Sequence, residues 1–167
     1  MFKENDIVVY GSQGVCKIGE TVQKVIKGKT QEYYVLYPIS RDNSAIFVPK
    51  ENPVLLDKIR NVLSLEEIKI LIKTLPESEY EWIDDDFSRR KKFREALSSG
   101  DRKAVASVIK SLYNEQQRRK VEKKKLAMSD EILLKQAEDL LYGELALVLN
   151  IKPEEVVPFL EKELSCK

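Results

Sequence analysis

The chain has 167 residues, which suits one ordinary domain or two small ones and argues against a single large catalytic architecture. Apolar residues make up 43% of the sequence and charged residues 34%, so the chain holds enough apolar material to fold around a core. The formal net charge is +1, and there is no histidine. Catalytic triads and zinc sites that depend on histidine are therefore excluded.

The N-terminus lacks the charged and apolar segments of a secretion signal, and no apolar stretch approaches membrane-spanning length. Cys16 and Cys166 are far apart in sequence and form neither a C-x-x-C pair nor a disulfide framework. We therefore expect a cytoplasmic protein with reduced, structurally incidental thiols, no membrane association and no cofactor. A monomer is the default expectation.

Basic residues are concentrated in one block of the chain. Residues 87–125 contain 14 Lys or Arg and 4 Asp or Glu, whereas 54–86 and 127–167 each contain 4 basic and 9 acidic residues. A local positive field of this kind attracts polyanions, although a solvated helix face is the alternative interpretation.

The first third of the sequence is typical of short β-strands separated by turns. Strands are predicted at residues 6–10, 14–18, 31–39 and 45–49, which are rich in β-branched and aromatic side chains. Turns are predicted at residues 11–14, 27–29 and 41–44. This pattern predicts a compact, strongly bent β barrel.

After Pro53 the apolar period changes to that of helices. Residues 64–67 form a capping box, followed by an apolar stripe on one helix face, and Pro76 ends that helix. The stripe consists of Leu65, Ile68, Leu71, Ile72 and Leu75. Another helix is predicted over about 88–98, with Gly100 as its left-handed C-terminal residue.

Asp101 is predicted to cap the next helix, whose buried stripe is Val105, Val108, Ile109, Leu112 and Tyr113. Residues 116–125 are either a solvated helix end or a loop. The longest apolar helix is predicted from Ser129, with Ile132 on its stripe, and Pro153 begins a last short one. The expected fold class is α+β, with a β barrel in residues 1–53 and a compact domain of about five helices in residues 54–167.

Several segments, taken together, resemble the CarD/CdnL family and the polymerase-interacting module that this family shares with the transcription-repair coupling factor. In the first half they are residues 6–10, 14–15, 26–28, 32–36 and 47–52; in the second half they are 98–101, 122–124 with Leu126, and 143–147. The resemblance implies an SH3/Tudor-like β domain that binds the β subunit of RNA polymerase. It also implies a helical domain that contacts promoter DNA at the upstream edge of the transcription bubble and stabilises the open complex.

Two residues are candidate polymerase contacts by this resemblance. Lys24 falls where the family commonly carries a basic contact residue. Phe47 falls where some members carry an arginine, so this sequence departs from the family there. An aromatic side chain can anchor an interface, although a core residue of the barrel is an equally good interpretation of Phe47.

Candidate DNA contacts are the lysines and arginines of the basic block. The first group is Arg89, Arg90, Lys91 and Lys92, and the second is Lys123, Lys124 and Lys125. Such side chains neutralise phosphates without reading bases, and nothing in the block resembles a recognition helix for base edges. We therefore expect contacts to the DNA backbone.

The resemblance further implies an aromatic wedge at the start of the basic helix, placed against the minor groove at the bubble edge. Trp82, the only tryptophan, lies upstream of that helix, whereas Phe87 directly precedes Ser-Arg-Arg. Trp82 is favoured because indole offers the larger stacking face. A structural role for Trp82, pinning the connection to the helices, is the alternative.

Two other classes of function are less well supported. Asp84, Asp85 and Asp86 are consecutive and cannot all converge on one metal ion, so a helix-capping role is favoured and no metal site is expected. An enzyme is not expected, since there is no Gly-rich phosphate loop or paired-carboxylate motif. A protein-binding adaptor of the transcription machinery with no DNA role remains the alternative function.

Overall fold

The computed structural model of the chain describes residues 2–39, 44–77 and 80–165. It divides into two compact units, Met1–Val62 and Leu63–Lys167. The boundary between the two units lies after Val62, whereas the sequence predicted a domain boundary after Pro53. The predicted turn at 41–44, residues 78–79 of the acidic connection and Cys166 lie wholly or partly outside the described residues.

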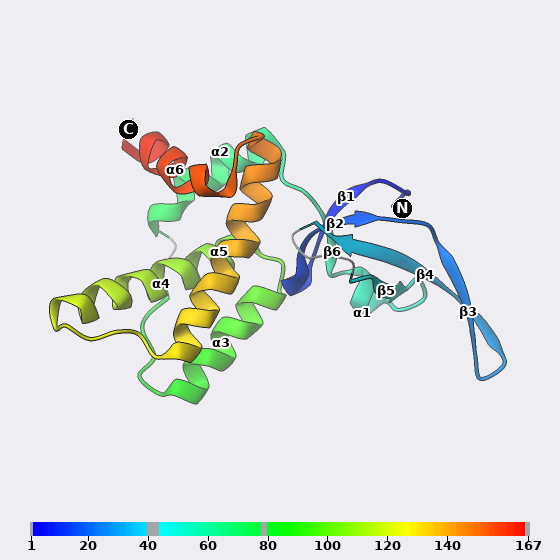
Figure 1. Cartoon of the computed structure of the whole chain (residues 1–167), viewed down its shortest axis with the longest axis horizontal. Coiled ribbons are helices and arrows are strands. Elements are labelled where there is room, and N and C mark those ends of the chain that lie inside the picture. Colours follow the sequence, from blue (N-terminus) through cyan, green and yellow to red (C-terminus); the bar gives the residue numbers. More distant parts are fainter. Residues whose placement is uncertain (1, 40–43, 78–79, 166–167) are drawn as a thin grey trace. The chain divides into compact units, whose positions relative to one another are not determined.

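The N-terminal unit is an antiparallel sheet with a short helix (Figure 1). Its elements are β1 (Ile7–Tyr10), β2 (Gly14–Ile18), β3 (Val22–Ile26), β4 (Lys29–Pro38), β5 (Ile46–Pro49), α1 (Pro53–Leu56) and β6 (Ile59–Asn61). The strand order is β3-β4-β2-β1-β6, and β5 also pairs with β4. The sequence predicted four of these strands and missed β3, β6 and α1.

The predicted α+β fold class is confirmed, but the sheet that was predicted as a β barrel is not closed. Within the described residues, β5 pairs with β4 and β6 pairs with β1, and no pairing joins β5 to β6. One face of the sheet is nevertheless packed. Its core is Val8, Cys16, Ile18, Tyr34, Leu36, Val48 and Ile59, residues that alternate along the longer strands.

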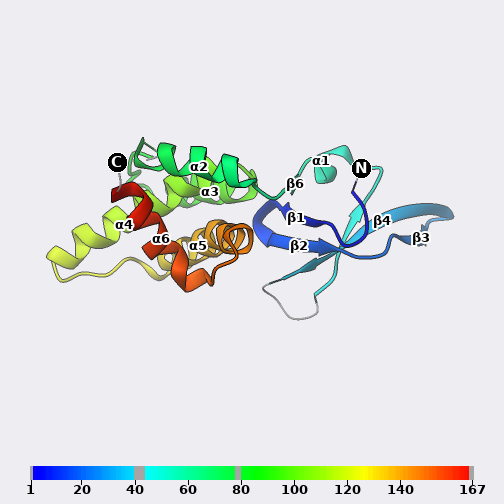
Figure 2. The same ribbon diagram turned by 90° about the horizontal axis from the view of Figure 1, so that it is seen from above.

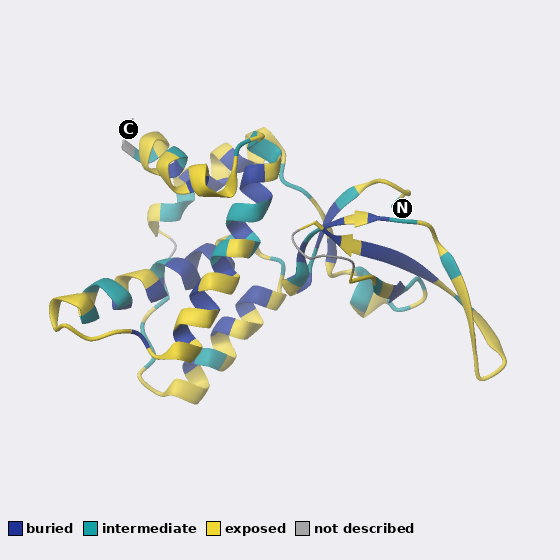
Figure 3. Cartoon of the chain, in the orientation of Figure 1, coloured by how far each residue is buried: buried dark blue, intermediate teal, exposed yellow. Residues whose placement is uncertain are grey.

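The hairpin formed by β3 and the start of β4 is exposed over most of its length (Figure 3). Its two loop residues, Lys27 and Gly28, both have positive φ, at 50° and 77°. Positive φ at both central positions is the geometry of tight hairpin turns that match the twist of the strands. The predicted turn at 27–29 therefore joins two strands, of which the sequence identified one.

The helical unit contains five α-helices among its described residues, as expected (Figure 2). They are α2 (Leu65–Thr74), α3 (Asp86–Ser98), α4 (Arg102–Val121), α5 (Met128–Leu149) and α6 (Val156–Ser165). The capping box at Ser64 is confirmed in both directions. Gly100 has a φ of 76°, and the Asp101 side chain caps α4. Pro153 begins a short 3-10 turn that leads into α6.

One contiguous apolar core joins the helices, with Phe93, Leu112, Leu133 and Leu145 among its buried members. Three residues predicted to face this core, Leu65, Tyr113 and Ile132, are instead exposed. Each lies at the edge of its stripe, where a rotation of one residue position moves a side chain into solvent. No helix within the described ranges is long and apolar enough to cross a membrane.

Candidate polymerase and nucleic-acid interfaces

Lys24 and Phe47 lie on the same face of the sheet, on strands that flank β4. Lys24 pairs with Gln31 of β4, and Phe47 pairs with Val35 of the same strand. Alternate residues of a strand share a face, so Gln31 and Val35 present both partners on one side. The Lys24 ammonium lies 3.6 Å from the centroid of the Phe47 ring, a cation–π contact.

Phe47 is not a core residue, because its side chain is 43% exposed. The face opposite carries Tyr34, Leu36 and Val48, which form the core of this unit. Lys24 and Phe47 thus form one small surface in which a positive charge lies on an aromatic ring. This surface can bury apolar area and contact an anionic or polar group together.

The segment that precedes α3 is tied to the helical core at two points. The Ser111 hydroxyl accepts a hydrogen bond from the Tyr80 N–H at 3.1 Å and donates one to the Tyr80 carbonyl at 2.8 Å. Further along, the Asp85 carboxylate accepts from the Ser88 N–H at 2.8 Å and caps α3. The hydrogen bonds from Ser88 hold the pKa of Asp85 below its ordinary value. The capping role predicted for this acidic run is confirmed.

Trp82 packs against the core within this segment. Its ring meets Phe93 edge to face, with the centroids 6.4 Å apart, and the Arg89 guanidinium lies 4.4 Å from its centroid. The side chain is half-buried. This placement fits the structural alternative for Trp82, in which the indole fastens the connection to the bundle.

Phe87 has the opposite environment. It is the second residue of α3 and is 77% exposed. Residues three and four positions apart share a helix face, so Phe87, Lys91 and Arg94 lie along one exposed strip of α3. Lys91 and Arg94 have no carboxylate partner in the part of the chain that the structure describes. We refer to these three residues as the α3 strip.

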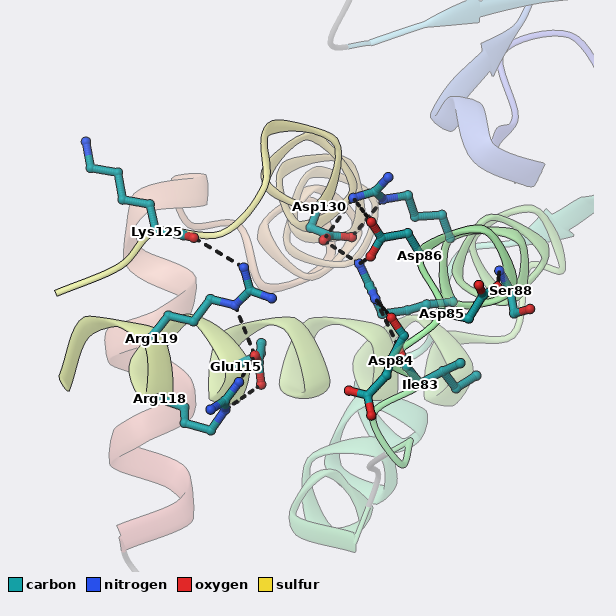
Figure 4. A network of polar contacts seen from close by, with 12 residues as sticks. Ile83, Asp84, Asp85, Asp86, Ser88, Glu115, Arg118, Arg119, Lys125 and Asp130 are labelled. Atoms are coloured by element: carbon teal, nitrogen blue, oxygen red, sulfur yellow. Dashed lines mark hydrogen bonds and ion pairs between the residues drawn. The ribbon is translucent and has the colours of Figure 1, made fainter. Parts of the chain in front are cut away.

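Arg89 is buried, which contradicts its predicted role as a phosphate contact. Its side chain is 1% exposed, and its Nη2 donates to Oδ1 of Asp86 and to Oδ2 of Asp130, both at 2.8 Å. The network is drawn in Figure 4. Burial opposes the charge, but the hydrogen bonds that Arg89 donates to Asp130 and then to Asp86 outweigh it and raise the pKa of Arg89. The run Ser-Arg-Arg-Lys-Lys is therefore not uniformly solvated.

Arg90 and Lys92 are partly occupied by contacts within the protein. Arg90 Nε lies 3.3 Å from Oδ1 of Asp130, and its Nη2 lies 3.7 Å from Asp86. The Lys92 ammonium lies 4.4 Å from the centroid of the Tyr80 ring but remains exposed. Of the four basic residues in the first predicted group, Lys91 and Lys92 present exposed charge.

The second group, Lys123, Lys124 and Lys125, lies in the loop after α4 and is exposed, with the Lys124 ammonium 3.9 Å from Glu122. The Lys124 N–H donates to the Arg119 carbonyl at 2.8 Å, and Lys123 has a φ of 58°. Together these features make a left-handed helix end, a position usually held by glycine. The alternative left open at 116–125 is thus resolved as a helix to Val121 followed by a loop.

A second polar network fastens this loop to α4 (Figure 4). Arg118 Nε donates to Glu115 at 2.9 Å, and Arg119 Nε donates to the same carboxylate at 3.0 Å. Arg119 Nη1 also donates to the Lys125 carbonyl at 3.3 Å. Arg118 and Arg119 are engaged with Glu115, so the lysines of the loop carry its exposed positive charge.

The described part of the chain gives little support for metal binding or for thiol chemistry. No group of three or more His, Cys, Asp or Glu side chains there could hold a metal ion. Cys16 is a free thiol in the core of the sheet, and burial raises its pKa to about 11. A thiol with this pKa is protonated at neutral pH and is a poor nucleophile.

Family models match both units of the chain. The CarD-like/TRCF RID domain matches residues 2–63, and the CarD C-terminal domain matches residues 68–161. The second match alone covers more than half of the sequence. The chain belongs to the CarD family. The resemblance inferred from the sequence is confirmed, and the first match ends within one residue of the structural division after Val62.

Membership of the CarD family gives the protein its general function. The N-terminal match is to an RNA polymerase-interacting domain, so the protein is an RNA polymerase-interacting transcription regulator. The CarD family is a family of non-enzymatic transcription factors. Sequence reasoning alone missed two features of the candidate site: the burial of Arg89, and its pairing with Asp130, which lies 41 residues away.

Proposed function

We propose that this CarD-family protein binds the β subunit of RNA polymerase through its N-terminal unit and stabilises the promoter open complex through its helical unit. The helical unit contacts DNA at the upstream edge of the bubble without reading sequence. The single observation that carries the DNA part is the α3 strip, which presents the exposed Phe87 beside the exposed cations of Lys91 and Arg94.

The α3 strip combines the two properties that such a contact requires. Lysine and arginine neutralise phosphates, and this contribution weakens steeply with salt. An exposed aromatic ring can insert against a distorted base step in the minor groove. Phe87 takes the role of the wedge in this proposal, because Trp82 is engaged with Phe93 and Arg89. The exposed Lys92 and the lysines at 123–125 add backbone contacts.

The polymerase contact is assigned to the surface formed by Lys24 and Phe47. The aromatic ring supplies contact area at a low cost in side-chain entropy, and the lysine supplies charge. Docking on polymerase raises the effective concentration of the helical unit at the DNA, so a weak intrinsic affinity for DNA suffices. A wedge that binds only melted DNA shifts the population toward the open complex.

Salt dependence of duplex binding tests the DNA part of the proposal. We expect the double variant Lys91→Ala/Arg94→Ala to bind duplex DNA more weakly, with the slope of log affinity against log salt reduced by about 2. Lys69→Ala/Lys73→Ala is the matched control, since it removes the same charge from the exposed side of α2. The control should keep the wild-type slope.

Two results would contradict this assignment. If the wild-type protein bound no DNA at any salt concentration, the protein would act as an adaptor that binds only proteins. If both double variants lost the same slope, the attraction would come from overall charge and not from the α3 strip. A parallel pull-down with the polymerase β subunit should give equal recovery for all three proteins, because the substitutions lie in the helical unit.

A further inference from the structure

Arg89 is the largest fully buried side chain among the described residues, although it lies in a basic run that includes the exposed Lys91 and Lys92. A buried guanidinium is expensive to desolvate, and its cost is offset only by several well-placed acceptors. Its position in the basic block is therefore not explained by attraction to DNA.

The guanidinium of Arg89 joins three segments of the helical unit. Its Nη1 donates to the Ile83 carbonyl at 2.9 Å, in the connection that carries Trp82. Its Nη2 donates to Asp86 in the first turn of α3 and to Asp130 in the first turn of α5. Figure 4 labels these three partners, Ile83, Asp86 and Asp130, within the network of polar contacts.

These contacts lie next to Phe87, the residue that is proposed as the wedge. Phe87 directly follows Asp86, so the Arg89–Asp86 hydrogen bond holds the residue beside Phe87 in the first turn of α3. Asp130 is 0% exposed and follows the lysine loop by five residues, so the same guanidinium also fixes the start of α5. The planar fork of arginine can reach these acceptors at once, whereas the single ammonium of lysine cannot reproduce that geometry.

We propose that Arg89 is a positioning residue for Phe87: it locks the Trp82 connection, the first turn of α3 and the first turn of α5 together, and it makes no contact with phosphate. This inference rests on the proposed function, in which Phe87 is the wedge. The buried network around Arg89 then holds Phe87 rigid before DNA binds. A contact residue that is already rigid loses less conformational entropy on binding.

Two substitutions distinguish a positioning role of Arg89 from an effect of charge alone, because the two explanations predict different outcomes for them. Arg89→Lys keeps the positive charge but not the fork. Asp86→Asn removes an exposed acid next to Phe87 and makes the protein more positive. If charge alone mattered, Arg89→Lys would be silent and Asp86→Asn would strengthen DNA binding. We expect both to shorten the lifetime of the open complex formed by the full-length protein with polymerase on a promoter.

A double-variant cycle with Phe87→Ala separates positioning from general damage to the fold. We expect the lifetime with Arg89→Lys/Phe87→Ala to equal that with Phe87→Ala within about twofold, because Arg89 acts only through Phe87. The salt slope of duplex binding should be unchanged by Arg89→Lys and by Arg89→Met. If Arg89→Lys is not folded at the assay temperature, Asp86→Asn and its double variant with Phe87→Ala decide the question.

The outcomes distinguish this inference from the function on which it rests. A lifetime unchanged by Phe87→Ala would overturn the proposed function itself. A lifetime shortened by Phe87→Ala but unchanged by Arg89→Lys and Asp86→Asn would overturn only the positioning role. The positioning role would also be overturned if the losses of open-complex lifetime from the two single substitutions multiplied in the double variants. A salt slope of duplex binding that falls by about 1 in Arg89→Met would overturn it too.

Discussion

The ammonium of Lys24 lies 3.6 Å from the centroid of the Phe47 ring, and the two residues belong to strands on opposite sides of β4. The contact therefore spans three strands of the sheet, on the face opposite its apolar core. It places a charge and an exposed aromatic ring where the protein is proposed to meet the polymerase β subunit.

We predict that Phe47→Ala weakens binding to the polymerase β subunit by about 1–2 kcal/mol, as truncation of an aromatic anchor does. Lys24→Glu should also weaken binding, because it reverses a contact charge. Val54→Ala is the control, since Val54 is an exposed apolar residue on α1 and not on this face. Titration calorimetry checks the affinities. Equal affinity of Phe47→Ala and Val54→Ala would exclude Phe47 from the interface.

The fragment that ends at Pro53 should be less stable than the fragment that ends at Val62. The shorter one lacks β6, which pairs with β1, and loses the buried side chain of Ile59. Burial of an isoleucine side chain contributes about 1.5–3 kcal/mol, so the urea midpoint should fall clearly. Equal midpoints for the two fragments would show that the domain ends at Pro53, as the sequence suggested.

Lys123→Gly should stabilise the helical unit while weakening DNA binding. Lys123 has a φ of 58°, a conformation that costs a residue with a Cβ atom about 1 kcal/mol and costs glycine little. Lys124→Gly is the matched control, since it removes the same charge at a residue without positive φ. We expect a raised melting temperature only for Lys123→Gly and a salt slope lowered by about 1 for both. A melting temperature raised equally by both variants would contradict the strain argument.

The Glu115 network should make stability depend on pH in the acid range. Hydrogen bonds from Arg118 and then Arg119 outweigh burial and hold the pKa of Glu115 below its ordinary value of 4.5. A lowered pKa in the folded state contributes stability that is present above pH 4.5 and lost as the pH falls through the folded-state value. Glu115→Gln should therefore unfold more easily at neutral pH.

The measurement is the difference in unfolding free energy between wild type and Glu115→Gln as a function of pH. The difference should stay constant at neutral pH and shrink below pH 4.5. A difference that stays the same down to about pH 3 would mean that the carboxylate charge of Glu115 contributes nothing.

Features set by neighbouring residues could be predicted from the sequence, whereas features set by distant pairing could not. The capping box at Ser64 and the left-handed Gly100 follow from residues within one turn, and both are confirmed. β6 has three residues, and its only strand partner among the described residues is β1, about fifty positions earlier. β3 was missed because its residues are mostly exposed and lack the alternating pattern of a half-buried strand.

The same limit applies to the candidate site. A run such as Ser-Arg-Arg-Lys-Lys indicates a basic helix, but the burial of Arg89 depends on Asp130 in another helix. The choice between Trp82 and Phe87 likewise depends on Phe93, whose ring lies against the indole. The sequence favoured Trp82 as the wedge because indole has the larger stacking face. In the structure, however, the ring that remains exposed is that of Phe87.

The most direct test of the account is the lifetime of the promoter open complex with wild type, Phe87→Ala and Trp82→Ala, measured together with the melting temperature of each protein. We expect Phe87→Ala to abolish the extension of the lifetime while its melting temperature stays close to that of wild type. Trp82→Ala should lower the melting temperature, with a loss of roughly 1–3 kcal/mol in unfolding free energy, because it removes the contacts with Phe93 and Arg89. A lifetime that is unchanged in a folded Phe87→Ala protein would contradict the central claim that the exposed ring at the start of α3 holds the bubble open.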